Sequence, residues 1–105
     1  MGLQNVVSGK EAVVMGSFNQ VTGDNGTAIG AYNETSGTFA VALGVATDAT
    51  GYISTTLGIY TQATDTAATA MGGFSVASGV ASTAMGGYTE ASGRNAVAMG
   101  RYSKA

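Results

Sequence analysis

The side chains of this chain that are best suited to binding are aromatic, and they recur at a fixed interval. Phenylalanine or tyrosine occupies every fourteenth position over most of the sequence, with Ala46 in the one gap. This aromatic column comprises Phe18, Tyr32, Tyr60, Phe74, Tyr88 and Tyr102. Flat rings with polar edges can stack on sugars or contact an extended polypeptide with little loss of entropy. The column is therefore a candidate ligand contact. The alternative is that the rings stack on one another and shield the backbone of neighbouring repeats.

Glu34 and Asp48 are a second candidate for chemistry, because the two carboxylates lie one repeat apart. Carboxylates on neighbouring strands can share a cation, or they can repel each other weakly in water. No third oxygen ligand accompanies them, so we do not predict a metal site. Glu90 and Lys104 are also one repeat apart and would form an ordinary surface pair that contributes little.

Catalysis is disfavoured by the residues that are absent. The chain has no histidine and no cysteine, which excludes hydrolase triads that use histidine, zinc centres built from these residues, and thiol chemistry. A serine or threonine without a partner base is not a catalytic site. We therefore predict that the protein is not an enzyme and has no catalytic, cofactor-binding or metal-binding residues. The net charge of -2 argues against nucleic acid as a partner.

Two columns of glycine set the spacing of the chain. The first begins at Gly9 and is interrupted only by Asp65, whereas the second runs half a repeat out of step and has no exception. Such self-similarity at a fixed period indicates a repeat architecture. We interpret both columns as turns that need a positive φ, since Asp adopts that conformation with modest strain. The predicted turn residues are Gly9, Gly16, Gly23, Gly30, Gly37, Gly44, Gly51, Gly58, Asp65, Gly72, Gly79, Gly86, Gly93 and Gly100.

Each repeat is expected to form two short β-strands. Fourteen residues are too few for two helices, and glycine at every seventh position would cost a helix about 0.5–1 kcal/mol each time. Segments 96–99 and 102–105 alternate in character, as strands do. Each repeat then forms one rung of an all-β parallel solenoid, and rungs about 4.8 Å apart would build a rod on the order of 35 Å long. Residues 1–105 form one array, with a half repeat at 1–7 and seven full repeats at 8–105.

The predicted first strand of each repeat has one face of large aliphatic residues and one face of small residues. The small residues suit two sheets packed closely together, so the aliphatic residues must point outward. An exposed aliphatic stripe is an association surface, and burial against further copies would give a symmetric homo-oligomer. The aliphatic column, the predicted subunit interface, consists of Met15, Ile29, Leu43, Leu57, Met71, Met85 and Met99, with Met1 half a repeat earlier.

The half-repeats AMGRYSKA, residues 98–105, and AIGAYNET, residues 28–35, resemble the AIGxxSxA signature of head repeats in YadA-like trimeric autotransporter adhesins. The resemblance extends over seven ungapped copies. It implies a homotrimer of left-handed parallel β-rolls at the tip of a bacterial surface fibre, with adhesion to host extracellular matrix or to surface glycans and proteins, and hence a part in virulence. This chain departs from the signature in preferring methionine to isoleucine and in its regular aromatic position.

Two alternatives to the adhesin stay open, because similar repeats occur in bacteriophage tail fibres and because a stiff rod can be a passive structural spacer. The sequence contains neither a stretch of about 20 apolar residues nor a signal peptide. We expect a slice of a longer protein that is anchored in the outer membrane through other segments, or carried on a phage virion. This segment itself is expected to make no membrane contact.

Overall fold

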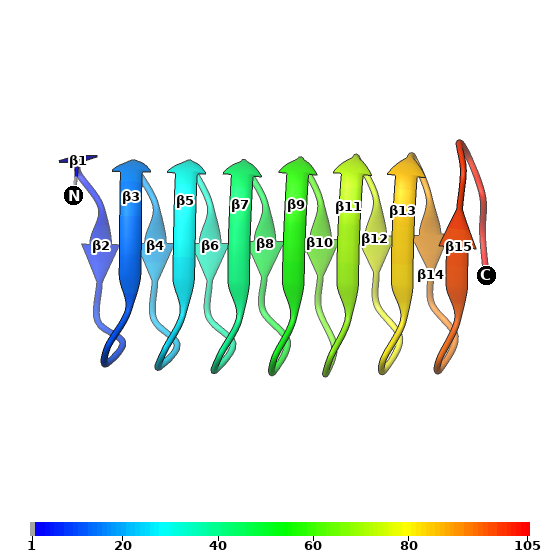
Figure 1. Cartoon of the computed structure of the whole chain (residues 1–105), viewed down its shortest axis with the longest axis horizontal. Helices are drawn as coiled ribbons and strands as arrows, with labels where there is room; N and C mark the ends of the chain where they lie inside the picture. The colour runs from blue at the N-terminus through cyan, green and yellow to red at the C-terminus, as the bar shows by residue number, and fades with distance from the viewer. Residues whose placement is uncertain (1) are drawn as a thin grey trace.

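The chain forms a flat rod of stacked rungs. A computed structural model describes residues 2–105, which measure 36 × 20 × 10 Å. Every regular element among these residues is a β-strand, which confirms the predicted all-β solenoid. In Figure 1 the chain rises along the front strands, descends behind them and advances toward the C-terminus, so the coil is left-handed. Helices able to cross a membrane are absent from the described part of the chain.

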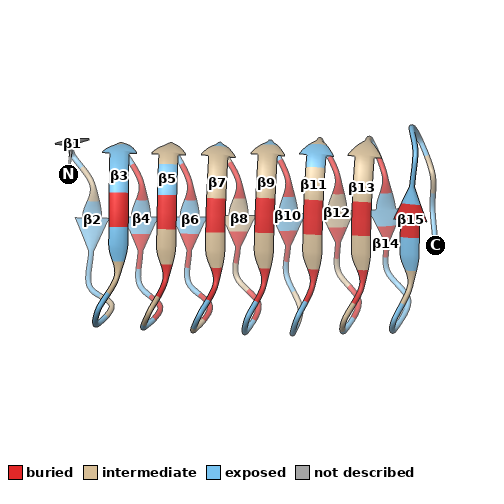
Figure 2. Cartoon of the chain, viewed as in Figure 1, coloured by how far each residue is buried: buried red, intermediate tan, exposed pale blue. Residues whose placement is uncertain are grey.

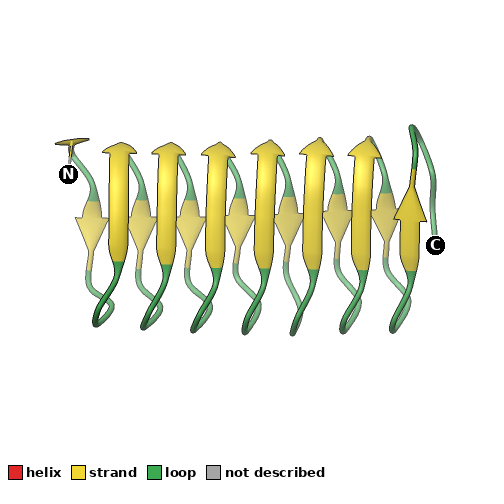
Figure 3. Cartoon of the chain, in the orientation of Figure 1, coloured by secondary structure: helices red, strands yellow, loops and turns green. Residues whose placement is uncertain are grey.

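Each rung contributes one strand to each of two parallel sheets (Figure 3). The long sheet contains β1 (Gly2–Leu3), β3 (Val13–Ser17), β5 (Thr27–Ala31), β7 (Val41–Val45), β9 (Thr55–Ile59), β11 (Thr69–Gly73), β13 (Thr83–Gly87) and β15 (Val97–Met99). The short sheet contains β2 (Val6–Val7), β4 (Gln20–Val21), β6 (Glu34–Thr35), β8 (Asp48–Ala49), β10 (Gln62–Ala63), β12 (Val76–Ala77) and β14 (Glu90–Ala91). Each strand residue pairs with the residue one repeat along, as Met71 does with Met85. Equivalent side chains therefore form straight columns along the rod.

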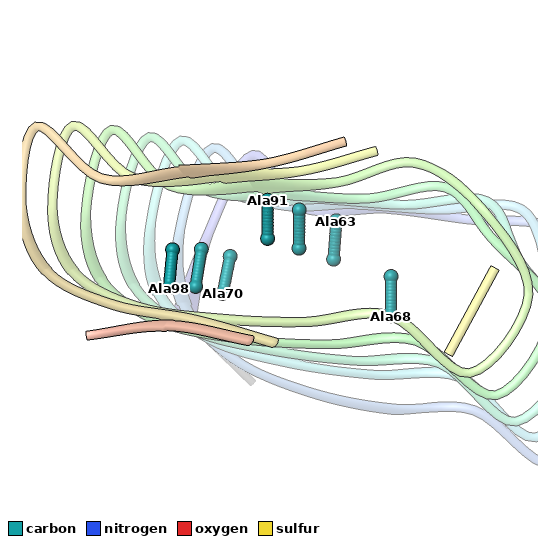
Figure 4. Packing of buried hydrophobic residues seen from close by; sticks show 7 residues of the cluster. Ala63, Ala68, Ala70, Ala91 and Ala98 are labelled. Carbon is teal, nitrogen blue, oxygen red and sulfur yellow. The ribbon is translucent and has the colours of Figure 1, made fainter. Parts of the chain in front are cut away.

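The space between the two sheets is filled by small side chains. Ala70 and Ala98 of the long sheet point toward the short sheet, from which Ala63 and Ala91 point back (Figure 4). One residue of each long strand from β3 to β15 is buried in this way, which gives these strands a buried segment near the middle (Figure 2). Because alanine extends little beyond its backbone, the sheets can approach closely, and the rod is thin.

Buried polar residues continue the columns inside the N-terminal half. The backbone N–H of Asn33 donates to Oδ1 of Asn19 at 3.1 Å, and the N–H of Thr47 donates to Oδ1 of Asn33 at 3.1 Å. Nδ2 of Asn19 also donates to the carbonyl oxygen of Met15 at 2.9 Å. These bonds satisfy groups that would be costly to bury unpaired, and the two bonds to asparagine Oδ1 atoms also tie each rung to the next.

The two glycine columns have different reasons for being glycine. In the column that begins at Gly16, φ lies between 105° and 133°, and all members but Gly100 lie within long strands or at their ends rather than in loops. The column that begins at Gly9 has no positive φ, nor has Asp65. A β-carbon built on Gly51 would instead overlap the carbonyl group of Asp65 on the next rung. The prediction that both columns need a positive φ was therefore wrong for the Gly9 column, whose glycines permit close approach of neighbouring rungs.

Candidate functional site

The aromatic column lies at the corner where each long strand leads into the next short strand. Phe18, for example, follows β3 and precedes β4. All members have φ between 56° and 61°, a left-handed conformation that is uncommon outside glycine. The backbone at this corner is tied to the preceding rung, since the N–H of Tyr88 donates to the carbonyl oxygen of Gly73 at 2.8 Å. The rings were expected within the second strand. They lie before it, because the left-handed residue turns the chain from one sheet to the other.

The rings stack face to face along the rod. The centroids of Phe18 and Tyr32 are 5.0 Å apart with an interplanar angle of 4°. A longer stack runs through Tyr60, Phe74, Tyr88 and Tyr102, with centroid distances of 5.1, 4.9 and 5.2 Å. The rings thus stack on one another, as the structural alternative predicted, whereas shielding of the backbone stays a prediction. The rings nevertheless remain 42–63% exposed, and their role in ligand contact stays a prediction.

The aliphatic column lies on the outer face of the long sheet, pointing away from the interior. Met15 is 49% exposed and Met99 is 60% exposed, while Leu43 and Leu57 are half-buried by their neighbours. Valines and threonines of the same strands, such as Val41 and Thr55, flank this column on the same face. We call this surface the apolar face. Its role as a subunit interface is still a prediction.

A second exposed apolar cluster lies at the opposite corner of the rod, and sequence reasoning missed it. Phe39, Tyr52 and Ile53 are each about half exposed in the connections that enter β7 and β9. Phe39 and Ile53 have φ of 59° and 57°. The equivalent positions in other repeats vary in type, so the periodic pattern carried no signal for them.

Glu34 and Asp48 pair in register on β6 and β8. Burial, followed by the nearby charge of Glu34, raises the pKa of Asp48 above its usual value. Over the described residues there is no group of three acidic side chains that could hold a metal ion. The backbones of Glu90 and Lys104 pair as an isolated parallel β-bridge in the same column. The described surface also contains no pocket.

Comparison with known protein families identifies the family to which the repeats belong. The family model described as the YadA head domain repeat matches residues 8–33, 63–89 and 77–103, which together make up more than half of the chain. The chain belongs to the YadA head domain repeat family. A search of curated proteins returned no match.

The segments that match the YadA head repeat do not include residues 34–62. The fourteen-residue register and the hydrogen bonds between rungs continue through this segment. Its side chains differ from the repeat, however, since it contains Ala46 in the aromatic column and the exposed Phe39, Tyr52 and Ile53. The side chains in which this chain departs from its own repeat are therefore concentrated on the rungs formed by residues 34–62.

Proposed function

We propose that this YadA head repeat array is the head of a bacterial cell-surface adhesin that works as a homotrimer. The observation that carries the proposal is the apolar face, which a single rod leaves in contact with water. Burying an aliphatic side chain such as Leu43 or Leu57 contributes roughly 1.5–3 kcal/mol. Several rungs acting together would offset the cost of association. Three copies that pack these faces together would form a compact head.

The aromatic column supports the adhesive part of the proposal. It lies at a corner of the rod, outside the aliphatic column and the neighbouring valine and threonine column that make up the apolar face. A trimer built on the apolar face would thus carry three accessible ladders of rings. A fibrous host matrix protein or a surface glycan that touches several rungs on several subunits gains avidity through effective concentration, even where each contact is weak.

Light scattering coupled to size-exclusion chromatography tests the assembly. The parent chain should have three times the mass of one subunit. Leu43→Asp combined with Leu57→Asp should give a monomer that keeps its β-sheet circular dichroism, because the two charges would have to be buried in the interface. Thr22→Asp combined with Ser36→Asp is the matched control. It places the same charges on two neighbouring rungs at exposed positions outside the long sheet, and it should remain trimeric. A monomeric parent would contradict the proposal.

A further inference from the structure

The aromatic column lacks a ring at one position, Ala46, although the backbone there is unchanged. Ala46 has φ of 56°, against 59° for Tyr32 and 56° for Tyr60 on the flanking rungs. The N–H of Ala46 donates to the carbonyl oxygen of Ala31 at 2.9 Å, as the N–H of Tyr60 does to Val45 at 3.0 Å. The corner therefore runs continuously through this rung, and only the side chain differs.

The missing ring leaves space for one flat ring. Tyr32 and Tyr60 stack on Phe18 and Phe74 at 5.0 and 5.1 Å, and they lie two rungs apart. Their centroids should therefore be about 10 Å apart, two steps of the ladder. Elsewhere in the column a ring occupies each such step. Tyr32 and Tyr60 are 61% and 54% exposed, whereas Tyr88, which has a ring on both sides, is 49% exposed. One face of each flanking ring is thus open toward Ala46.

The same rungs carry negative charge beside this position. Glu34 and Asp48 follow Tyr32 and Ala46 by two residues, on the strands that pair as β6 and β8. The raised pKa of Asp48 reflects burial and the unfavourable charge of Glu34. Lys104, the one basic residue in this column of the short sheet, lies at the far end of the rod. A cation placed between Glu34 and Asp48 would therefore be stabilised by both carboxylates.

We propose that an aromatic side chain of a partner polypeptide inserts between Tyr32 and Tyr60 over Ala46, with an adjacent Lys or Arg of the partner against Glu34 and Asp48. A ring inserted there is covered on both faces, whereas a ring that touches the stacked part of the column meets only edges. The inference rests on the proposed adhesive function and deepens it, since it names the partner chemistry. It also assigns a role to rungs that lie outside the segments matched by the family model.

Nuclear magnetic resonance titration with two short peptides tests the insertion. Acetyl-Lys-Phe-Lys-amide should bind in the millimolar range, with upfield shifts of its ring protons and shifts of the backbone amides of Tyr32, Ala46 and Tyr60. Acetyl-Lys-Leu-Lys-amide should bind about tenfold more weakly, because leucine cannot stack. Glu34→Gln combined with Asp48→Asn should weaken binding of both peptides several-fold and reduce its dependence on salt.

Filling the position from within the chain is the decisive variant. Ala46→Phe should abolish binding of the phenylalanine peptide. Ala67→Phe is the matched control, because Ala67 has φ of 57° and is exposed at the opposite corner, and this variant should bind like the parent. Should Ala46→Phe fail to fold, Tyr60→Asn removes one wall instead and should weaken binding about tenfold. Unchanged binding by Ala46→Phe, or unchanged binding by Tyr60→Asn in that case, would overturn the insertion.

The outcomes separate this inference from the proposed function. A trimeric Ala46→Phe variant that binds the phenylalanine peptide like the parent overturns the insertion and leaves the trimeric adhesin standing. A monomeric parent that shows the expected shifts at Ala46 supports the insertion and overturns the assembly. Shifts confined to Phe18 and Tyr102, the ends of the column, would place the contact on the terminal rings and overturn the insertion.

Discussion

Gly51 lies so close to the carbonyl group of Asp65 on the next rung that a β-carbon built on Gly51 would overlap it. The same relationship recurs along the Gly9 column, where Gly37 meets the carbonyl group of Gly51 and Gly79 meets that of Gly93. These contacts hold neighbouring rungs together at one narrow edge of the rod. At Gly37, Gly51 and Gly79 they leave no room for a β-carbon, whatever backbone conformation the new residue prefers.

The first prediction compares two glycines that differ in this respect. Gly51→Ala should destabilise the fold by about 1–3 kcal/mol, because the added methyl group must push two rungs apart. At Gly73 a β-carbon would meet no heavy atom of the described residues within 4 Å, and φ there is not positive. Gly73→Ala should therefore be neutral or slightly stabilising. Thermal unfolding followed by circular dichroism gives the melting temperatures of the two variants. Equal values would show that close approach of the rungs is not the reason for glycine at position 51.

The second prediction concerns backbone strain at the corner of the rod that lies opposite the aromatic column. Ile53 has φ of 57°, a conformation in which a β-branched residue is strained by roughly 1–2 kcal/mol. Asn25 and Asn95 occupy equivalent positions in other rungs with φ of 57° and 59°. Ile53→Asn should therefore raise the melting temperature, since asparagine tolerates this backbone better.

Ile59 provides the control for that substitution. It is 50% exposed, close to the 49% of Ile53, but it lies in β9 with ordinary strand geometry. Ile59→Asn should lower the melting temperature, because it loses apolar contact and strand preference without relieving strain. A shift of both variants in the same direction would argue against strain at Ile53.

The third prediction is a pH dependence that arises from Asp48. Its raised pKa in the folded state means that, between the unfolded and folded pKa values, the native chain binds more protons than the unfolded chain. The contribution of this group to stability is therefore present at low pH and is lost as the pH rises through the folded pKa. Asp48→Asn should stabilise the fold at pH 7, with a benefit that shrinks as the pH approaches 4.

Glu34→Gln separates the two causes of that shift. Burial is the larger cause and the charge of Glu34 the smaller, so removing this charge should stabilise the fold less than Asp48→Asn does. Melting temperatures of the parent and both variants across this pH range give the comparison. A constant difference between Asp48→Asn and the parent at every pH would contradict the assignment.

The rung and its register follow from the sequence, whereas the backbone at the corners does not. A strict fourteen-residue period leaves little choice but to stack equivalent positions, as Met71 and Met85 do. Glycine, however, serves both positive φ and close approach, so the sequence alone cannot distinguish Gly58 from Gly51. The left-handed conformation at the aromatic corner could not be predicted, because Tyr and Phe rarely adopt it and the residues that favour it are Gly, Asn and Asp.

The candidate site was predictable to a similar extent. The aromatic column and its interruption at Ala46 are visible in the sequence, and so is the pairing of Glu34 with Asp48. That the rings are parallel and about one rung apart requires the structure, because it depends on the corner geometry. The exposed cluster around Phe39 and Ile53 could not be predicted, since its residues break the repeat instead of following it.

The last prediction tests whether the aromatic column mediates adhesion. Tyr60→Asn, Phe74→Asn and Tyr88→Asn together remove three consecutive rings, and asparagine accepts the left-handed backbone that each position requires. If the column is the contact, this variant should remain trimeric, and its binding to immobilised matrix proteins or glycans should fall at least about tenfold, since avidity multiplies the loss at each rung. Surface plasmon resonance and light scattering measure the two properties.

The opposite corner supplies a matched control for that experiment. Phe39→Asn, Ile53→Asn and Ala67→Asn change three positions on consecutive rungs with φ of 59°, 57° and 57°, and they leave every ring of the column in place. This variant should bind like the parent. Parent-level adhesion by a trimeric variant without the three rings would mean that the stack is purely structural. Loss of adhesion only in the control would place the contact at the corner of Phe39 and Ile53, where the chain departs most from its own repeat.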